Sequence, residues 1–149
     1  MRIFRLHRGQ RAAADYGGSQ LYSNRWNLAG TPMLYAASSL SLACLEILVH
    51  LMPGQIPPAY VYSSAKLNRR PHVADFRGDV EDEASTRRYG QWWANDRRDV
   101  AILVPSVVIP SERNVLLNPT HSDFDEIVWD DPKPFGFDKR LLRSPGHFS

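Results

Sequence analysis

The chain has 149 residues, and its 18 Lys and Arg against 16 Asp and Glu leave a formal net charge of +2. Apolar residues make up 43% and charged residues 23%, ordinary proportions for a globular protein, so a disordered chain is excluded. The single cysteine excludes an internal disulfide and a cysteine-rich metal site. The near-even charge gives no general argument for nucleic-acid binding.

The N-terminal residues are charged and lack the apolar run of a secretory signal. The longest nearly uncharged stretch, about residues 30–58, contains Glu46, His50 and several prolines, so it does not fit a membrane span. We therefore expect one domain over residues 1–149, with no membrane segment and a cytoplasmic location.

The elements predicted from apolar runs and turn residues are, in chain order, a strand at 3–6, a loop at 10–24, a strand at 33–37, a helix from Ser38 or Ser39 to about Met52 that Pro53-Gly54 ends, a strand at 59–67, a helix at 84–96, and strands at 101–104, 107–109, 114–118, 126–129 and 135–137. Strands flanking two helices without a regular βαβ alternation indicate an α+β domain with a mixed or antiparallel sheet.

Glu46 is the most informative residue, because it lies in the middle of a predicted helix that is apolar on nearly every side. We expect this helix to be buried, and a glutamate is seldom buried without a partner. Its carboxylate can pair with a structural arginine or with His50 four residues on, or it can line a cleft where substrate replaces water. A third interpretation makes Glu46 and His50 two metal ligands, although no supporting cluster accompanies them.

Other candidates have both a structural and a functional interpretation. Arg25 follows a glycine-containing loop and suits a phosphate, or it is a surface cation beside a core tryptophan, Trp26. Tyr35 faces either the core or a cleft. Ser106 either satisfies a backbone group near Pro105 or points its hydroxyl into a pocket. There is neither a P-loop nor a G-x-G-x-x-G motif.

Three ordered motifs join these residues, and together they resemble the RES domain, a family named after an arginine, a glutamate and a serine that here match Arg25, Glu46 and Ser106. The motifs are Arg25-Trp26-Asn27-x-x-Gly30-Thr31-Pro32-x-x-Tyr35-Ala36-x-Ser38, Leu42-Ala43-x-x-Glu46-x-Leu48-Val49-His50, and Val104-Pro105-Ser106-x-x-Ile109-Pro110-x-Glu112-x-Asn114-x-Leu116-Leu117-Asn118-Pro119. The similarity extends from Phe4-Arg5 to Phe137-Asp138-x-Arg140-Leu141.

The resemblance implies the toxin of a bacterial toxin–antitoxin pair, with a fold similar to ADP-ribosyltransferases. It implies that NAD⁺ is consumed as a substrate, by hydrolysis or phosphorolysis, and that no cofactor is needed. The implied partner is an antitoxin with an Xre-like helix-turn-helix domain, so that DNA is reached only through the antitoxin. A homodimer is also compatible with the resemblance.

The resemblance also implies roles for individual residues. Glu46, Arg25 and Ser106 form the expected catalytic set, with Glu46 stabilising the positive charge on the ribose. Arg25 would bind the diphosphate, Tyr35 would pack against the nicotinamide ring, and Ser106 would bond to the nicotinamide or ribose. Trp26 completes the expected substrate-binding set.

Two alternative functions stay open at this point. The same residues would serve a protein ADP-ribosyltransferase, because only the acceptor differs. An RNA-directed toxin is a more remote alternative, whose support is three Arg-Arg pairs and the neighbouring Trp92 and Trp93.

Overall fold

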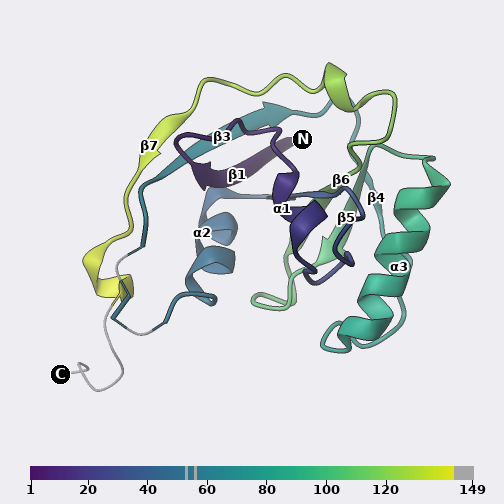
Figure 1. Ribbon diagram of the computed structural model, residues 1–149, viewed down its shortest axis with the longest axis horizontal. Coiled ribbons are helices and arrows are strands. Elements are labelled where there is room, and N and C mark those ends of the chain that lie inside the picture. Colours follow the sequence, from purple (N-terminus) through teal and green to yellow (C-terminus); the bar gives the residue numbers. More distant parts are fainter. Residues whose placement is uncertain (53, 56, 143–149) are drawn as a thin grey trace.

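The computed structural model describes residues 1–52, 54, 55 and 57–142, and these form a seven-stranded sheet with helices packed against it (Figure 1). The elements are β1 (Arg2–Arg8), α1 (Gly17–Leu21), β2 (Leu34–Ala37), α2 (Leu40–Leu48), β3 (Tyr60–Lys66), β4 (His72–Val73), α3 (Glu83–Asp96), β5 (Ala101–Pro105), β6 (Arg113–Leu117), η1 (Phe124–Glu126), β7 (Lys133–Phe135) and η2 (Lys139–Leu142). Among the described helices, none is both long enough and apolar enough to cross a membrane.

The strand order in the sheet is β4-β5-β6-β2-β1-β3-β7. Among the strands that the structure describes, only β4 and β5 pair in parallel, and the other pairs are antiparallel. The expected α+β class with a mixed sheet is therefore confirmed. The expectation of one domain over residues 1–149 extends into 143–149, which lie outside the described residues.

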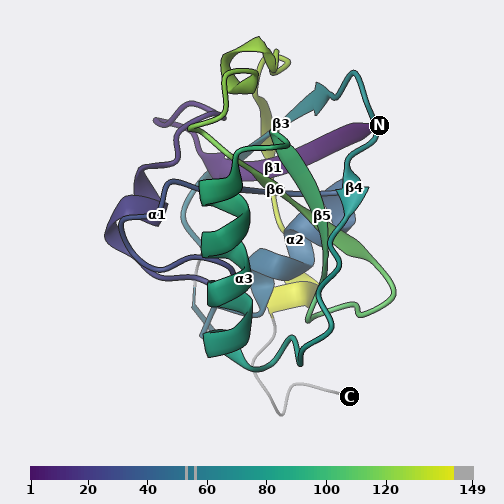
Figure 2. The same cartoon turned by 90° about the vertical axis from the view of Figure 1, so that its right-hand side faces the viewer.

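The two longer helices, α2 and α3, pack on the same face of the sheet. Leu6 and Ala37 contribute to the cluster under α2, while Ile102 and Leu116 contribute to the cluster under α3. The strand registers place these four side chains on one face, because side chains alternate along a strand. In Figure 1 the helices stand apart, with β5 and β6 between them in the view, and Figure 2 shows α3 from the front. The other face packs around Ile3.

The first predicted helix is shorter and less buried than expected. It ends at Leu48 with Val49 as its C-cap, while the predicted stop signal at Pro53 lies outside the described residues. Ser39 is the N-cap, and its hydroxyl accepts a hydrogen bond from the Leu42 N–H. The prediction that this helix is buried on nearly every side is wrong, because Leu42, Ala43 and Cys44 are buried whereas residues 45–48 are only half-buried.

Two predicted strands are wrong. Residues 107–109 form bends, because the Ser106 hydroxyl accepts hydrogen bonds from the N–H groups of Val108 and Ile109 and turns the chain back. In the segment 126–129, η1 ends at Glu126, and Trp129 makes only an isolated bridge to Ala65. The prediction also missed α1, β4 and η2, three short elements with little apolar periodicity.

Helix α3 approaches the backbone of the segment 24–27 so closely that only glycine fits at one position. A Cβ atom placed on Gly90 would lie 1.7 Å from the carbonyl oxygen of Trp26. The Asp82 side chain caps the start of this helix by accepting from the Ala84 N–H. The missing side chain of Gly90 therefore sets how closely α3 and the Trp26 backbone pack.

We expect Gly90→Ala to lower the free energy of unfolding by roughly 1–3 kcal/mol or more, because the methyl group collides with backbone rather than with a flexible side chain. Gly18→Ala is the matched control, since Gly18 is also helical but a Cβ atom there would have nothing within 4 Å. Urea unfolding of both variants measures the difference. Equal midpoints for the two variants would contradict the close approach.

Candidate active site

Glu46 is anchored by one oxygen of its carboxylate. Its Oε1 accepts hydrogen bonds from the Ser106 hydroxyl at 2.7 Å and from Asn114 Nδ2 at 2.8 Å. Within the described residues, Oε2 has no hydrogen-bond partner and no cation forms an ion pair with Glu46. His50 is exposed in the turn that follows α2, so the interpretations that pair Glu46 with His50 or with an arginine are wrong. One oxygen is thus fixed and the other is available.

Ser106 is fully buried and holds Glu46 in place. Its hydroxyl donates to Glu46 and accepts from the N–H groups of Val108 and Ile109, at 3.1 and 3.0 Å. A serine hydroxyl offers one donor and two acceptor positions, so all of them are occupied. The structural interpretation of Ser106 is confirmed, and the same hydroxyl also orients the carboxylate. Direct contact with a substrate stays a prediction, and it would require one of these bonds to break.

Asn114 is a site residue that belongs to the third motif but is missing from the predicted catalytic and substrate-binding sets. It lies on β6, opposite Ala37 of β2 and Val104 of β5, and its amide reaches Glu46. A signal was available, because Asn114 has the same strand parity as the core residue Leu116 and is a polar residue among apolar ones.

Tyr35 connects this carboxylate site to the segment 24–27. Its hydroxyl donates to Asn27 Oδ1 at 2.6 Å and accepts from the Trp26 N–H at 3.1 Å. Burial raises the pKa of the Tyr35 phenol above its ordinary value, so the hydroxyl is neutral near pH 7. Tyr35 pairs with Leu116, and this register makes it a diagonal neighbour of Asn114 on the same face of the sheet.

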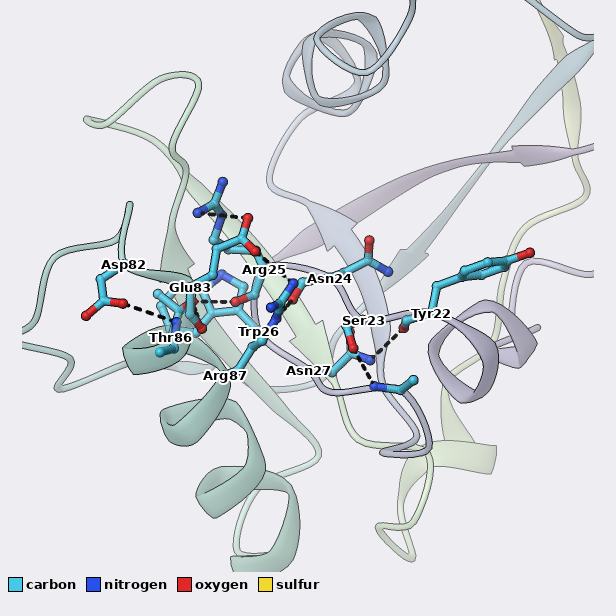
Figure 3. A network of polar contacts seen from close by, with 12 residues as sticks. Tyr22, Ser23, Asn24, Arg25, Trp26, Asn27, Asp82, Glu83, Thr86 and Arg87 are labelled. Atoms are coloured by element: carbon cyan, nitrogen blue, oxygen red, sulfur yellow. Dashed lines mark hydrogen bonds and ion pairs between the residues drawn. The ribbon is translucent and has the colours of Figure 1, made fainter.

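Arg25 lies at the α3 end of the site (Figure 3). Its Nη1 donates to the carbonyl of Val80 at 3.1 Å and lies 3.5 Å from Glu83 Oε1, and its side chain is 30% exposed. Arg25 is thus a partly exposed cation with two bonded partners, as the structural interpretation expected, and phosphate binding by Arg25 stays a prediction.

The backbone of the Arg25 segment is held by α3. The Thr86 hydroxyl donates to the carbonyl of Arg25, and Arg87 Nε donates to the carbonyl of Asn24 at 2.9 Å. Together with the close packing of Gly90, these bonds fix the position from which the Arg25 side chain extends. Positioning of this arginine thus depends on a helix that is distant in sequence.

Trp26 is 2% exposed, and its ring makes edge contacts with Phe76 and Tyr89. The interpretation of Trp26 as a core tryptophan beside a cation is confirmed. Its backbone N–H donates a hydrogen bond to the Tyr35 hydroxyl and so is part of the candidate site. A substrate-binding role for its indole ring stays a prediction.

Arg5 is a second residue missing from the predicted set. Its Nε donates to the carbonyl of Tyr35 at 3.2 Å and its Nη1 to the carbonyl of Ala13 at 2.6 Å. Burial lowers the pKa of Arg5 to about 10, which leaves it charged at neutral pH. Arg5 thus supports the backbone of β2 at the position of Tyr35.

A cavity elsewhere in the molecule contains none of these residues. It has a volume of about 830 Å³ and is lined by residues of both charges, among them Arg69, Arg70, Asp99 and Glu126. The candidate site instead comprises Glu46 on α2, Tyr35 on the helix-covered face of the sheet, and Arg25 in the segment that contacts α3. Such a set offers a carboxylate that can stabilise a positive charge and a guanidinium that can bind an anion.

Comparison with known proteins identifies the family. Residues 1–138 match the model of the RES domain. The chain is 35% identical over 137 residues to a protein named "Prs ADP-ribosylating toxin" from Sphingobium sp. (strain YBL2), covering 85% of this chain and 84% of the relative. It is 29% identical over 154 residues to "Toxin Res" from Photorhabdus laumondii subsp. laumondii, covering 97% and 99%.

A solved structure shares the fold. It is the crystal structure of the M. tuberculosis MbcT–MbcA toxin–antitoxin complex, of which one chain aligns with a TM-score of 0.70 and 12% identity, over 90% of this chain and 83% of that chain. The family match over nearly the whole length agrees with the three motifs around Arg25, Glu46 and Ser106. The chain belongs to the RES domain family and is a toxin of the RES type.

Proposed function

We propose that this toxin consumes NAD⁺ by breaking the bond between nicotinamide and ribose. The observation that supports the proposal most strongly is the Glu46 carboxylate, with Oε1 held by Ser106 and Asn114 and Oε2 available. An oriented carboxylate is the group that this reaction requires, because positive charge develops on the ribose as the bond breaks.

The chemistry needs only one carboxylate. The electron pair of the breaking C–N bond goes to the nicotinamide nitrogen, which was cationic, so nicotinamide leaves as a neutral molecule without a general acid. The acceptor oxygen then bonds to the ribose carbon and releases its proton to solvent. An ordinary glycosidase needs a second carboxylate to protonate its leaving group, whereas this reaction does not.

The remaining residues fit the parts of the substrate by their chemistry. Arg25 supplies a guanidinium for the diphosphate, which it can bind through two parallel hydrogen bonds. Tyr35 supplies a neutral ring beside the reaction site. In this proposal Ser106 and Asn114 act by positioning Glu46.

We further propose a cognate antitoxin with an Xre-like helix-turn-helix domain as the partner. The structural neighbour comes from a toxin–antitoxin complex, which supports a partner of this kind. Contact with DNA would then be made by the antitoxin.

A second candidate function is ADP-ribosylation of a protein. The observation that favours it is the relative named "Prs ADP-ribosylating toxin". Incubation with isotopically labelled NAD⁺ and a cell extract separates the two reactions: label retained on protein favours transfer, and free ADP-ribose or its phosphate favours consumption of NAD⁺.

The first test is nicotinamide release from NAD⁺, with and without inorganic phosphate, by the wild type and Glu46→Gln. We expect the variant to release nicotinamide roughly 10²–10³-fold more slowly, because its amide fills the same space without negative charge. Dependence on phosphate would identify phosphorolysis.

Glu126→Gln is the matched control, since Glu126 is exposed and lines the separate cavity. It should keep the wild-type rate. A folded Glu46→Gln variant that turns over as fast as Glu126→Gln would overturn the mechanism.

A second test addresses the residues that hold Glu46. We expect Ser106→Ala to lower kcat about tenfold with little change in KM, because Glu46 is less well oriented while substrate contacts persist. Loss of the acceptor for two backbone N–H groups should also lower the free energy of unfolding by about 1–3 kcal/mol. Ser122→Ala, at an exposed serine, is the control.

Asn114→Ala should show the same loss in kcat without exposing the two N–H groups. An increase in KM at constant kcat in either variant would mean that the residue binds substrate directly, contrary to the positioning role.

A further inference from the structure

Two arginines converge on a single carboxylate at the start of α3 (Figure 3). Arg25 Nη1 lies 3.5 Å from Glu83 Oε1, and Arg87 Nη2 lies 2.8 Å from Glu83 Oε2. Each arginine therefore faces a different oxygen of the same group. The arrangement is accessible to solvent, since the side chains of Arg25, Arg87 and Glu83 are 30%, 26% and 46% exposed.

Both guanidinium groups have supports that do not depend on Glu83. Arg25 Nη1 also donates to the carbonyl of Val80, and Arg87 Nε donates to the carbonyl of Asn24. The backbone beneath Arg25 is bonded to Thr86 of α3. Removal of the carboxylate would therefore leave two positive charges on a framework that is already assembled.

Within the described residues, the Glu83 side chain is held by two partly exposed ion pairs, which contribute little because water and salt screen them. The neighbouring Asp82 does not take its place, because its carboxylate caps the Ala84 N–H and accepts from the Ser85 hydroxyl. A phosphate oxygen pair matches the same guanidinium geometry as a carboxylate and has more negative charge. An incoming phosphate can therefore displace Glu83 at small cost.

We propose that Glu83 occupies an anion site formed by Arg25 and Arg87, that a phosphate of the substrate replaces it there, and that Arg87 is a second phosphate-binding residue. This inference rests on the proposed function, which supplies the diphosphate. Glu83 then competes with the substrate phosphate for the two arginines, which weakens substrate binding. It also prevents other anions from binding to them.

The test is ADP binding by calorimetry to the purified chain, with adenosine as the probe that lacks phosphates. We expect Glu83→Gln to bind ADP several-fold more tightly than the wild type, because the internal competitor has lost its charge. Arg87→Gln should bind ADP roughly tenfold more weakly, since one charge-assisted contact is lost. Adenosine binding should change in neither variant.

Arg88→Gln is the matched control, because Arg88 is the next residue of the same helix, is exposed, and bonds to Ser85 rather than to Glu83. Arg87→Lys keeps the positive charge and controls for a folding defect caused by loss of that charge. We expect its affinity for ADP to lie between those of the wild type and Arg87→Gln. The gain expected for Glu83→Gln is the most discriminating result, since a purely structural salt bridge would give a loss.

Nicotinamide release measured on the same proteins separates the two proposals. The anion site would be overturned, and the proposed function left intact, by one combination of results. In it, all three variants (Glu83→Gln, Arg87→Gln and Arg88→Gln) release nicotinamide at the wild-type rate and bind ADP with equal affinity. Weaker ADP binding by Glu83→Gln would overturn it as well. A wild type that neither binds ADP nor releases nicotinamide would overturn the proposed function together with this inference.

Discussion

The hydrogen-bonded carboxylate of Glu46 is the interaction on which the rest of the site depends. It joins three segments, because Glu46 lies on α2, Ser106 follows β5, and Asn114 lies on β6. Ser106 also closes the bend after β5 with two backbone hydrogen bonds. The geometry of a single carboxylate oxygen is therefore tied to the path of the chain between two strands, and loss of the Ser106 hydroxyl would affect both.

At the opposite end of the site, the position of Arg25 is set by packing against a helix rather than by hydrogen bonds to its side chain alone. Arg25 lies in a segment with little regular structure, and its position comes from contacts with α3 rather than from its own neighbours. Gly90 allows the helix to touch the Trp26 carbonyl, and the Thr86 hydroxyl binds the carbonyl next to it. A rigid helix thus substitutes for secondary structure in an irregular segment, an arrangement common in binding sites.

Sequence patterns were most informative where apolar periodicity was strong. They predicted the central strands β1, β2, β3, β5 and β6 and helix α3 to within a few residues. They failed at residues 107–109, where β-branched side chains suggested a strand but the Ser106 hydroxyl bonded the backbone in a turn. They also overestimated the burial of α2, because an apolar composition does not say how much of a helix other elements cover.

The sequence by itself determined the family, through the ordered motifs around Arg25, Glu46 and Ser106, and the unusual placement of one acid in an apolar helix. Only the tertiary structure decided how these residues relate: that Ser106 orients Glu46, that Asn114 assists it, and that Arg25 shares Glu83 with Arg87. The physical reason is that hydrogen bonds and ion pairs form between atoms within a few ångströms. Ser106 and Asn114 lie 60 and 68 residues from Glu46, and Glu83 lies about 60 residues from Arg25, so only the sheet and α3 bring them together. Arg87 and Glu83 are instead one turn apart on α3.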